Sequence, residues 1–200
     1  MEQNFWRSLP RPFFALAPMA GVTDTVFRRV IARRAKPDVL WTEFVSCDGL
    51  VSRGREALLR DLVFDPLERP IVAQVFGATP KHFFETARLI VSLGFDGIDI
   101  NMGCPDKAVV AQGAGAALIR TPALARDIIL ATQEGIVSAD SSIPVSVKTR
   151  TGYMKDEIDT WIPTLLDADI AALTIHARTK RELSEVPRSS DPTHRASCPG

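Results

Sequence analysis

The chain has 200 residues, of which 46% are hydrophobic and 24% charged, a composition typical of a globular protein with a real core. Lys and Arg total 24 and Asp and Glu total 24, so the formal net charge is zero. This balance argues against a polybasic protein that holds nucleic acid by bulk electrostatics. No apolar run approaches the roughly 20 residues that span a membrane, and the first residues lack the layout of a signal peptide. The three cysteines are widely spaced, which favours neither a disulfide framework nor a zinc cluster. We therefore expect a reduced, cytoplasmic setting.

Strand and helix patterns alternate along the chain. Short apolar runs predict buried strands, and apolar residues at helical spacing predict helices between them. Thr23-Asp24 is a typical helix start, and two later helices open with a capping threonine followed by proline. The predicted strands are 13–19, 39–44, 70–76, 97–102, 144–148 and 171–176. The predicted helices are one from residue 23 onward, 50–62, one from 80 that Gly94 ends, 123–137, and one around 158–166 that contains Pro163 as a possible kink.

An alternation of strand and helix repeated about six times predicts a parallel sheet with helices outside it. No phosphate-binding fingerprint follows the first strand, which disfavours a dinucleotide-binding doubly wound sheet. We therefore predict an α/β fold of the (β/α)8 TIM-barrel type, with about six of the eight βα units in this chain. Residues 188–200 contain no Leu, Ile, Val or Phe and are predicted to be a disordered tail. Residues 1–187 would then form a partial barrel whose first and sixth strands have exposed edges.

Polar residues collect where the predicted strands end, which is where a barrel of this type has its active site. Several of these residues, taken singly, could also have a purely structural role. Lys148 could be an exposed strand-end lysine, His176 a core histidine, and Glu43 the partner of an arginine. Cys47 is interpreted as structural, and Cys198 lies in the predicted tail. The candidates at strand ends are Pro18, Met19, Glu43, Gln74, Asn101, Cys104, Lys148, Arg150, His176 and Arg178.

Cys104 lies in the loop Asn101-Met102-Gly103-Cys104-Pro105, directly after a predicted strand. Glycine lets the backbone turn sharply there, and the loop holds a thiol at the mouth of the barrel. A nucleophilic thiol needs a lowered pKa, whereas a proton donor must keep its proton until reaction. The residues leave both roles open. The glycine-rich segment 112–117 could hold an anion, and tight packing of loop against helix explains it equally well.

Six motifs, in order along the chain, resemble those of the tRNA-dihydrouridine synthases. The resemblance runs from about Phe13 to Pro187, and the Asn-x-Gly-Cys-Pro loop and the His-Ala-Arg-Thr run are its most specific parts. The motifs are APMAGVTD (17–24), the strand with Gln74 that ends in Phe76-Gly77, DINMGCP (99–105), GAGAAL (113–118), VKTRTGY (147–153) and IHARTK (175–180).

The resemblance implies an FMN-dependent enzyme that reduces uridines in tRNA to 5,6-dihydrouridine and uses NADPH to recharge the flavin. It implies that Cys104 is the general acid: hydride passes from the flavin to one carbon of the uracil double bond, and the thiol protonates the other. The implied partner is tRNA, with no metal and no membrane, and the implied state is a monomer. The implied FMN contacts are Pro18, Met19, Ala20, Gln74, Lys148 and His176, and the implied substrate contacts are Asn101, Arg150 and Arg178.

The sequence also departs from the family. There, glycine-rich loops after strands seven and eight grip the FMN phosphate, and a helical C-terminal domain helps to clamp the tRNA. Both are expected to be absent here, so an inactive fragment of such an enzyme is one alternative. Another FMN barrel oxidoreductase, acting on a small pyrimidine-like substrate, is a second. A plain RNA-binding module is disfavoured because no basic stripe with interleaved aromatics is present.

Overall fold

The computed structural model describes residues 4–183, so the predicted tail at 188–200 and Cys198 lie outside the described residues. A single parallel sheet organises the described chain, and its strands follow one another in chain order. The order is β1 (Ala15–Leu16), β2 (Val39–Trp41), β4 (Ile71–Phe76), β5 (Gly97–Met102), β6 (Val145–Gly152) and β7 (Ala172–Thr179), with the short β3 (Val45–Ser46) also paired with β4.

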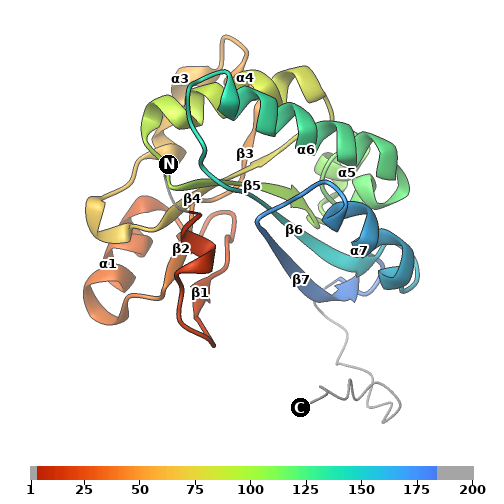
Figure 1. Ribbon diagram of the computed structural model, residues 1–200, viewed down its shortest axis with the longest axis horizontal. Coiled ribbons are helices and arrows are strands. Elements are labelled where there is room, and N and C mark those ends of the chain that lie inside the picture. Colours follow the sequence, from red (N-terminus) through yellow and green to blue (C-terminus); the bar gives the residue numbers. More distant parts are fainter. Residues whose placement is uncertain (1–3, 184–200) are drawn as a thin grey trace.

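Helices cover the outer side of this sheet, which curls into part of a barrel with β1 and β7 at its two edges (Figure 1). The predicted partial (β/α)8 barrel, with edges at the first and sixth strands, is therefore confirmed. The α-helices are α1 (Thr25–Ala35), α2 (Cys47–Leu50), α3 (Arg55–Leu59), α4 (Pro80–Leu93), α5 (Lys107–Ala111), α6 (Pro122–Val137) and α7 (Ile158–Leu166). The 3₁₀ turns are η1 (Phe5–Arg7), η2 (Arg60–Leu62), η3 (Pro66–Glu68) and η4 (Gly115–Arg120).

Helix boundaries follow the local signals in the sequence. The Asp24 side chain accepts the Phe27 N–H at 2.8 Å and so caps α1. Proline stands in the first turn of both α4 and α6, where its missing N–H costs nothing. Gly94 ends α4 in the left-handed conformation, with φ of 78°, as glycine does readily. Thr79 and Thr121 stand at the N-caps as predicted, but neither side chain makes a capping hydrogen bond, so the prolines and not the threonine hydroxyls mark these two starts.

Several predicted elements have other bounds in the structure. The predicted helix 50–62 is broken into α2, α3 and η2 by a turn at Ser52. The Ser52 hydroxyl donates to the Gly49 carbonyl and accepts the Gly54 N–H, bonds that compete with helical ones. Of the predicted strand 39–44, only β2 (Val39–Trp41) forms, and β3 begins beyond it at Val45. The last two strands instead run further than predicted, to Gly152 and Thr179.

The helical spacing of Phe27, Val30 and Ile31 predicts an apolar face on α1 that would be buried. In the structure Val30 is 54% accessible, Phe27 is also exposed and Ile31 is only partly buried, whereas the buried side chain of this helix is Arg28. Helix α1 stands beside β1, at one edge of the sheet (Figure 1). An edge helix has a neighbour on only one side, which leaves the rest of its apolar surface uncovered.

Helices α4 and α6 pack against each other. The stripe predicted for the helix from residue 80 is Phe83, Phe84, Ala87, Ile90 and Val91, and most of it is buried, with Phe83, Ala87 and Ile90 each at most 1% exposed. Helix α6 approaches the α4 backbone closely at Gly135. A Cβ at this position would lie only 2.4 Å from the Phe84 carbonyl oxygen.

Substituting Gly135 by alanine is therefore expected to lower the free energy of unfolding by roughly 1–3 kcal/mol, because the added methyl overlaps a backbone atom that cannot rotate away. Urea unfolding monitored by circular dichroism measures the change. Glu134→Ala, on the exposed face of the same helix, is the matched control and should change stability by less than about 0.5 kcal/mol. A stabilised Gly135→Ala variant, as helix propensity alone gives, would contradict the close approach.

No single helix within residues 4–183 is long and apolar enough to cross a bilayer. One pair, bent by 99°, passes the same test on length and composition: Lys107–Arg120 with Pro122–Val137. Its second member is α6, whose buried residues belong to the core beneath α4.

Candidate active site on the inner face of the sheet

The strand register gathers the polar candidates on one face of the sheet. Side chains alternate between faces along a strand, and residues paired in register share a face. The alternate residues of β5 and the first two of β6, Val145 and Val147, are apolar and belong to the core under the helices, so the polar side faces the inside of the curved sheet. The register pairs on the polar side are Gln74 with Asp99, Asp99 with Ser146, Asn101 with Lys148, and Arg150 with His176.

The Cys104 loop follows β5, and hydrogen bonds hold it at both the backbone N–H and the backbone carbonyl of Cys104. The Cys104 N–H donates to Asn101 Oδ1 at 2.9 Å, and the Cys104 carbonyl accepts the Ala116 N–H at 3.0 Å. Gly115 has φ of 58°, and a Cβ there would lie 2.8 Å from the Cys104 carbonyl oxygen. From the sequence, the glycine-rich segment 112–117 is interpreted either as an anion site or as a place of tight packing. The contact between Gly115 of η4 and the cysteine loop supports tight packing.

Burial raises the pKa of the half-buried Cys104 thiol above its ordinary value. The Asp106 backbone N–H opposes this shift, the Asp106 charge adds to it, and the charges of Arg150 and Lys148 oppose it. A thiol with a raised pKa keeps its proton at neutral pH, which suits a proton donor better than a nucleophile.

Cationic groups surround this thiol. Burial lowers the pKa of Lys148, while the Asp99 carboxylate acts in the opposite direction. Burial also lowers the pKa of His176, and the charges of Arg150, Lys148 and Arg178 lower it further. Lys148, Arg150, His176 and Arg178 thus lie close enough to influence one another, with Lys148 and Arg150 also acting on the Cys104 thiol, and this setting favours a neutral His176 imidazole.

Arg150 fastens this corner of the site. Its Nε–H donates to the Gly103 carbonyl at 2.7 Å, and its Nη1 donates to the Thr179 and Leu183 carbonyls at 3.1 and 3.0 Å. The side chain is buried and ties the cysteine loop to the end of β7. These bonds give Arg150 a structural role that the sequence did not suggest, and its contact with substrate stays a prediction.

The segment Pro18, Met19 and Ala20 follows the carboxyl end of β1, as the cysteine loop follows the carboxyl end of β5. The Met19 N–H donates to Thr23 Oγ1 at 3.0 Å. The Gly21 N–H donates to the Glu43 carboxylate, so Glu43 has a backbone partner here rather than an arginine. Met19 is 41% exposed and Ala20 is also exposed, which leaves this turn accessible. Its contact with a cofactor stays a prediction.

Asp99 is the residue of this site that the sequence analysis missed. It is fully buried, and burial raises its pKa to about 6, although the Ser146 and Gln74 hydrogen bonds and the Lys148 charge oppose that shift. Its carboxylate accepts the Gln74 amide and the Ser146 hydroxyl, each at 2.6 Å. An acidic residue two positions before Asn101, inside an otherwise apolar strand, was the available signal.

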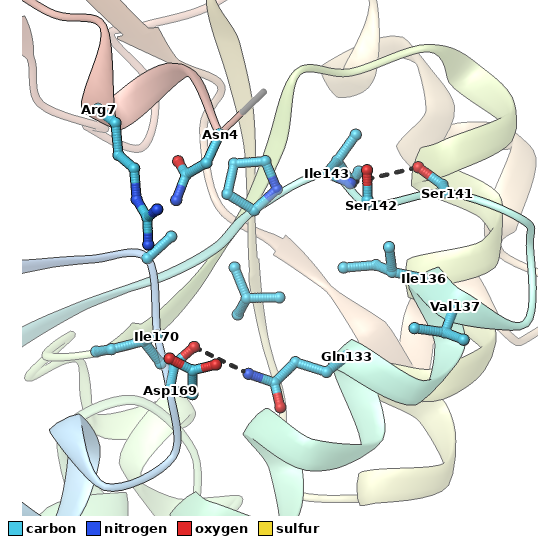
Figure 2. Close-up of a pocket in the computed structure, with 13 residues that line it drawn as sticks. Asn4, Arg7, Gln133, Ile136, Val137, Ser141, Ser142, Ile143, Asp169 and Ile170 are labelled. Carbon is cyan, nitrogen blue, oxygen red and sulfur yellow. Dashed lines mark hydrogen bonds between the residues drawn. The ribbon is translucent and has the colours of Figure 1, made fainter. Parts of the chain in front are cut away.

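A hollow of about 330 Å³ lies elsewhere, at the amino-terminal ends of β6 and β7 (Figure 2). Asn4, Arg7, Gln133 and Asp169 are among the residues that line it, and Gln133 donates to the Ala168 and Asp169 carbonyls. Barrels of this type carry their chemistry at the other end of the strands, so this hollow is not the candidate site. Among residues 4–183, no cluster of three His, Cys, Asp or Glu side chains is arranged to hold a metal ion.

A parallel, curled sheet with outer helices and a polar inner face defines an α/β chain of the TIM-barrel type. A solved structure of a variant of NCR from Zymomonas mobilis has the same arrangement, with a TM-score of 0.53 and 19% identity over 81% of this chain and 63% of that chain. A likeness at this identity shows the fold alone.

The chain belongs to the dihydrouridine synthase family, whose profile, "Dihydrouridine synthase (Dus)", matches residues 15–191. It is 45% identical, over 188 residues, both to a probable tRNA-dihydrouridine synthase of Staphylococcus aureus and to the probable tRNA-dihydrouridine synthase 2 of Bacillus subtilis. Each alignment covers 93% of this chain and 56% of the relative, so the chain spans about half the length of these relatives. The resemblance drawn from the motifs is confirmed.

Proposed function

We propose that this chain carries the catalytic face of a flavin-dependent enzyme that reduces uridine in tRNA to 5,6-dihydrouridine. The family and the names of its relatives support this class of reaction. The observation that carries the proposal is the Cys104 loop, which hydrogen bonds to Asn101 and Ala116 hold at the carboxyl end of β5, with Lys148 and Arg150 close enough to act on the thiol.

The residues of the inner face fit an FMN ring by their chemistry. Lys148 offers an ammonium donor on this face. Gln74 is completely inaccessible in this structure, so its contact with the flavin stays a prediction. Met19 and Ala20 are exposed and could be reached by a ligand. Bound FMN, recharged by NADPH, supplies the hydride in this proposal.

Lys148 would stabilise the negative charge that builds up during reduction, and His176 would offer a hydrogen bond beside it. Lys148 projects from β6 on the inner face, where partial burial strengthens its attraction to a nearby anion. The neutral His176 imidazole adds a hydrogen-bonding group without a further charge. Both residues act on the cofactor side of the site in this proposal.

Cys104 would complete the reaction by proton transfer. Its S–H bond breaks, and the proton forms a C–H bond at the uracil carbon that does not receive the hydride. The thiolate left behind carries one negative charge, which the neighbouring Arg150 and Lys148 stabilise. Because Cys104 is only half buried, water can return the proton before the next cycle.

Asn101 and Arg178 would hold the uridine. Asn101 uses its oxygen for the cysteine loop and one N–H for Gln74, so its second N–H is available to a base. Arg178 lies on β7 close enough to influence His176 and Arg150 and would contact a phosphate. The target base must leave its stack to reach the inner face.

The test is a flavin titration followed by a reduction assay. Purified chain is titrated with FMN and monitored by absorbance, and then mixed with NADPH and unmodified tRNA, with dihydrouridine quantified by mass spectrometry. Free uracil in place of tRNA is the control for a small-molecule oxidoreductase. Flavin binding with reduction of tRNA supports the proposal. Preferential reduction of free uracil, or no flavin binding by a folded sample, contradicts it.

A further inference from the structure

An unbroken series of side-chain hydrogen bonds runs from Asp99 to the cysteine loop. Asp99 Oδ2 accepts the Gln74 Nε2–H at 2.6 Å, and Gln74 Oε1 accepts the Asn101 Nδ2–H at 3.0 Å. Asn101 Oδ1 then accepts the backbone N–H groups of Gly103 and Cys104, at 3.1 and 2.9 Å. The three side chains of this series are buried.

Asp99 determines which atoms donate and which accept in this series of hydrogen bonds. A carboxylate only accepts hydrogen bonds, so Gln74 must turn its NH₂ group toward Asp99 and its oxygen toward Asn101. Asn101 must in turn present its NH₂ group to Gln74 and its oxygen to the loop. If either amide were reversed, two donors or two acceptors would face each other in a buried place, which is costly.

The other end of the series is where the chemistry is proposed to occur, and Asp99 is linked to the cysteine loop through Gln74 and Asn101 while its charge also acts on Lys148. Asp99 lies on β5 two residues before Asn101, and its second carboxylate oxygen accepts the Ser146 hydroxyl at 2.6 Å. It is completely inaccessible to solvent and therefore to any substrate. A buried carboxylate is kept at a cost, because its desolvation is unfavourable.

We propose that Asp99 is a positioning residue, which fixes the orientation of the Gln74 amide and, through Asn101, the placement of the Cys104 loop. It acts without touching base or cofactor. Its effect on catalysis rests on the proposed function, whereas its effect on the loop does not. The hydrogen bonds at Gly103 and Cys104 are therefore the direct readout.

Hydrogen exchange of the Gly103 and Cys104 amides tests the first part. Asp99→Ala is expected to accelerate exchange at both by about fivefold or more, because Asn101 is no longer held as an acceptor. Asp99→Asn keeps an acceptor for Gln74 while its NH₂ group bonds the Ser146 oxygen, so it should restore protection. Ser146→Ala removes the other partner of the carboxylate and is the matched control, with no acceleration expected.

The Phe27 amide, capped by Asp24 on a distant helix, reports any general loss of stability. If Asp99→Ala does not fold, Gln74→Leu breaks the series at its middle and should release the same two amides. Unchanged exchange at Gly103 and Cys104 in a folded Asp99→Ala or Gln74→Leu protein overturns the proposal.

Turnover tests the second part. In the tRNA assay, Asp99→Ala is expected to lower kcat roughly 10- to 100-fold, since a slightly misplaced thiol reacts slowly, with KM for tRNA nearly unchanged. Asp99→Asn should recover most of that loss. Faster exchange with unchanged kcat would overturn the positioning role in the reaction. If the parent chain reduces no tRNA, the proposed function fails while the exchange experiment still decides whether Asp99 places the loop.

Discussion

Replacing Cys104 by alanine is expected to slow dihydrouridine formation by roughly 10²- to 10⁴-fold, the contribution of a well-placed general acid. Flavin affinity should stay the same, because the thiol lies on the substrate side of the proposed site. The raised pKa of the thiol and the two cations beside it are the physical reason for its assignment as the donor. Single-turnover reoxidation of the reduced flavin by tRNA, with dihydrouridine quantified by mass spectrometry, measures the effect.

The matched control is Cys47→Ala, which removes the other cysteine that the structure describes. Cys47 is buried in the core beside α4, and burial raises the pKa of its thiol far above the ordinary value, so it has no part in the proposed reaction. Its variant should keep the parent rate of reduction. Parent-level turnover by Cys104→Ala on natural tRNA would show that another group delivers the proton.

Replacing Glu68 by alanine is expected to lower the free energy of unfolding by about 3–5 kcal/mol, the usual cost of stranding a buried charge. The Arg28 Nε–H donates to Glu68 Oε2 at 2.6 Å, and both side chains are completely inaccessible. Two further Arg28 donors reach the Thr23 and Val63 carbonyls, each at 2.7 Å, which hold the guanidinium in place after its partner is removed. Urea unfolding measures the loss.

Two further variants separate the charge from the packing. Arg28→Met combined with Glu68→Leu removes both charges and should recover most of the stability that Glu68→Ala loses. Arg29→Ala, which removes the neighbouring surface pair with Asp65, should change stability little, since water screens that pair. A Glu68→Ala variant as stable as the parent would show that the buried guanidinium does not depend on its carboxylate.

Much of the fold could be predicted because its signals are local. The Asp24 cap, the Thr-Pro pairs at the starts of α4 and α6, and Gly94 are each recognisable within a few residues. The alternation of these helices with apolar runs was enough to predict a parallel sheet of the barrel type. The Cys104 loop could be found because a cysteine between glycine and proline after a buried strand is unusual on its own.

What could not be predicted depends on residues distant in sequence. Glu68 stands 40 residues from Arg28, and nothing near either one shows that they meet in the interior. Asp99 was overlooked because the partners that make its burial tolerable come from two other strands. The exposure of Phe27 and Val30 is also invisible to helical periodicity, which identifies an apolar face without showing whether another element covers it.

The strictly sequential order of the strands has a consequence for synthesis on the ribosome. Each major strand pairs with the one completed just before it, from β1 through β7, so no strand must wait for a partner made much later. Partial sheets can therefore form as the polypeptide emerges, with each new βα unit adding to a layer that already exists. At every stage the last strand made has an unpaired edge, which another nascent chain could pair with. The pace of translation therefore affects whether that edge pairs with the next strand of its own chain or with a strand of another chain.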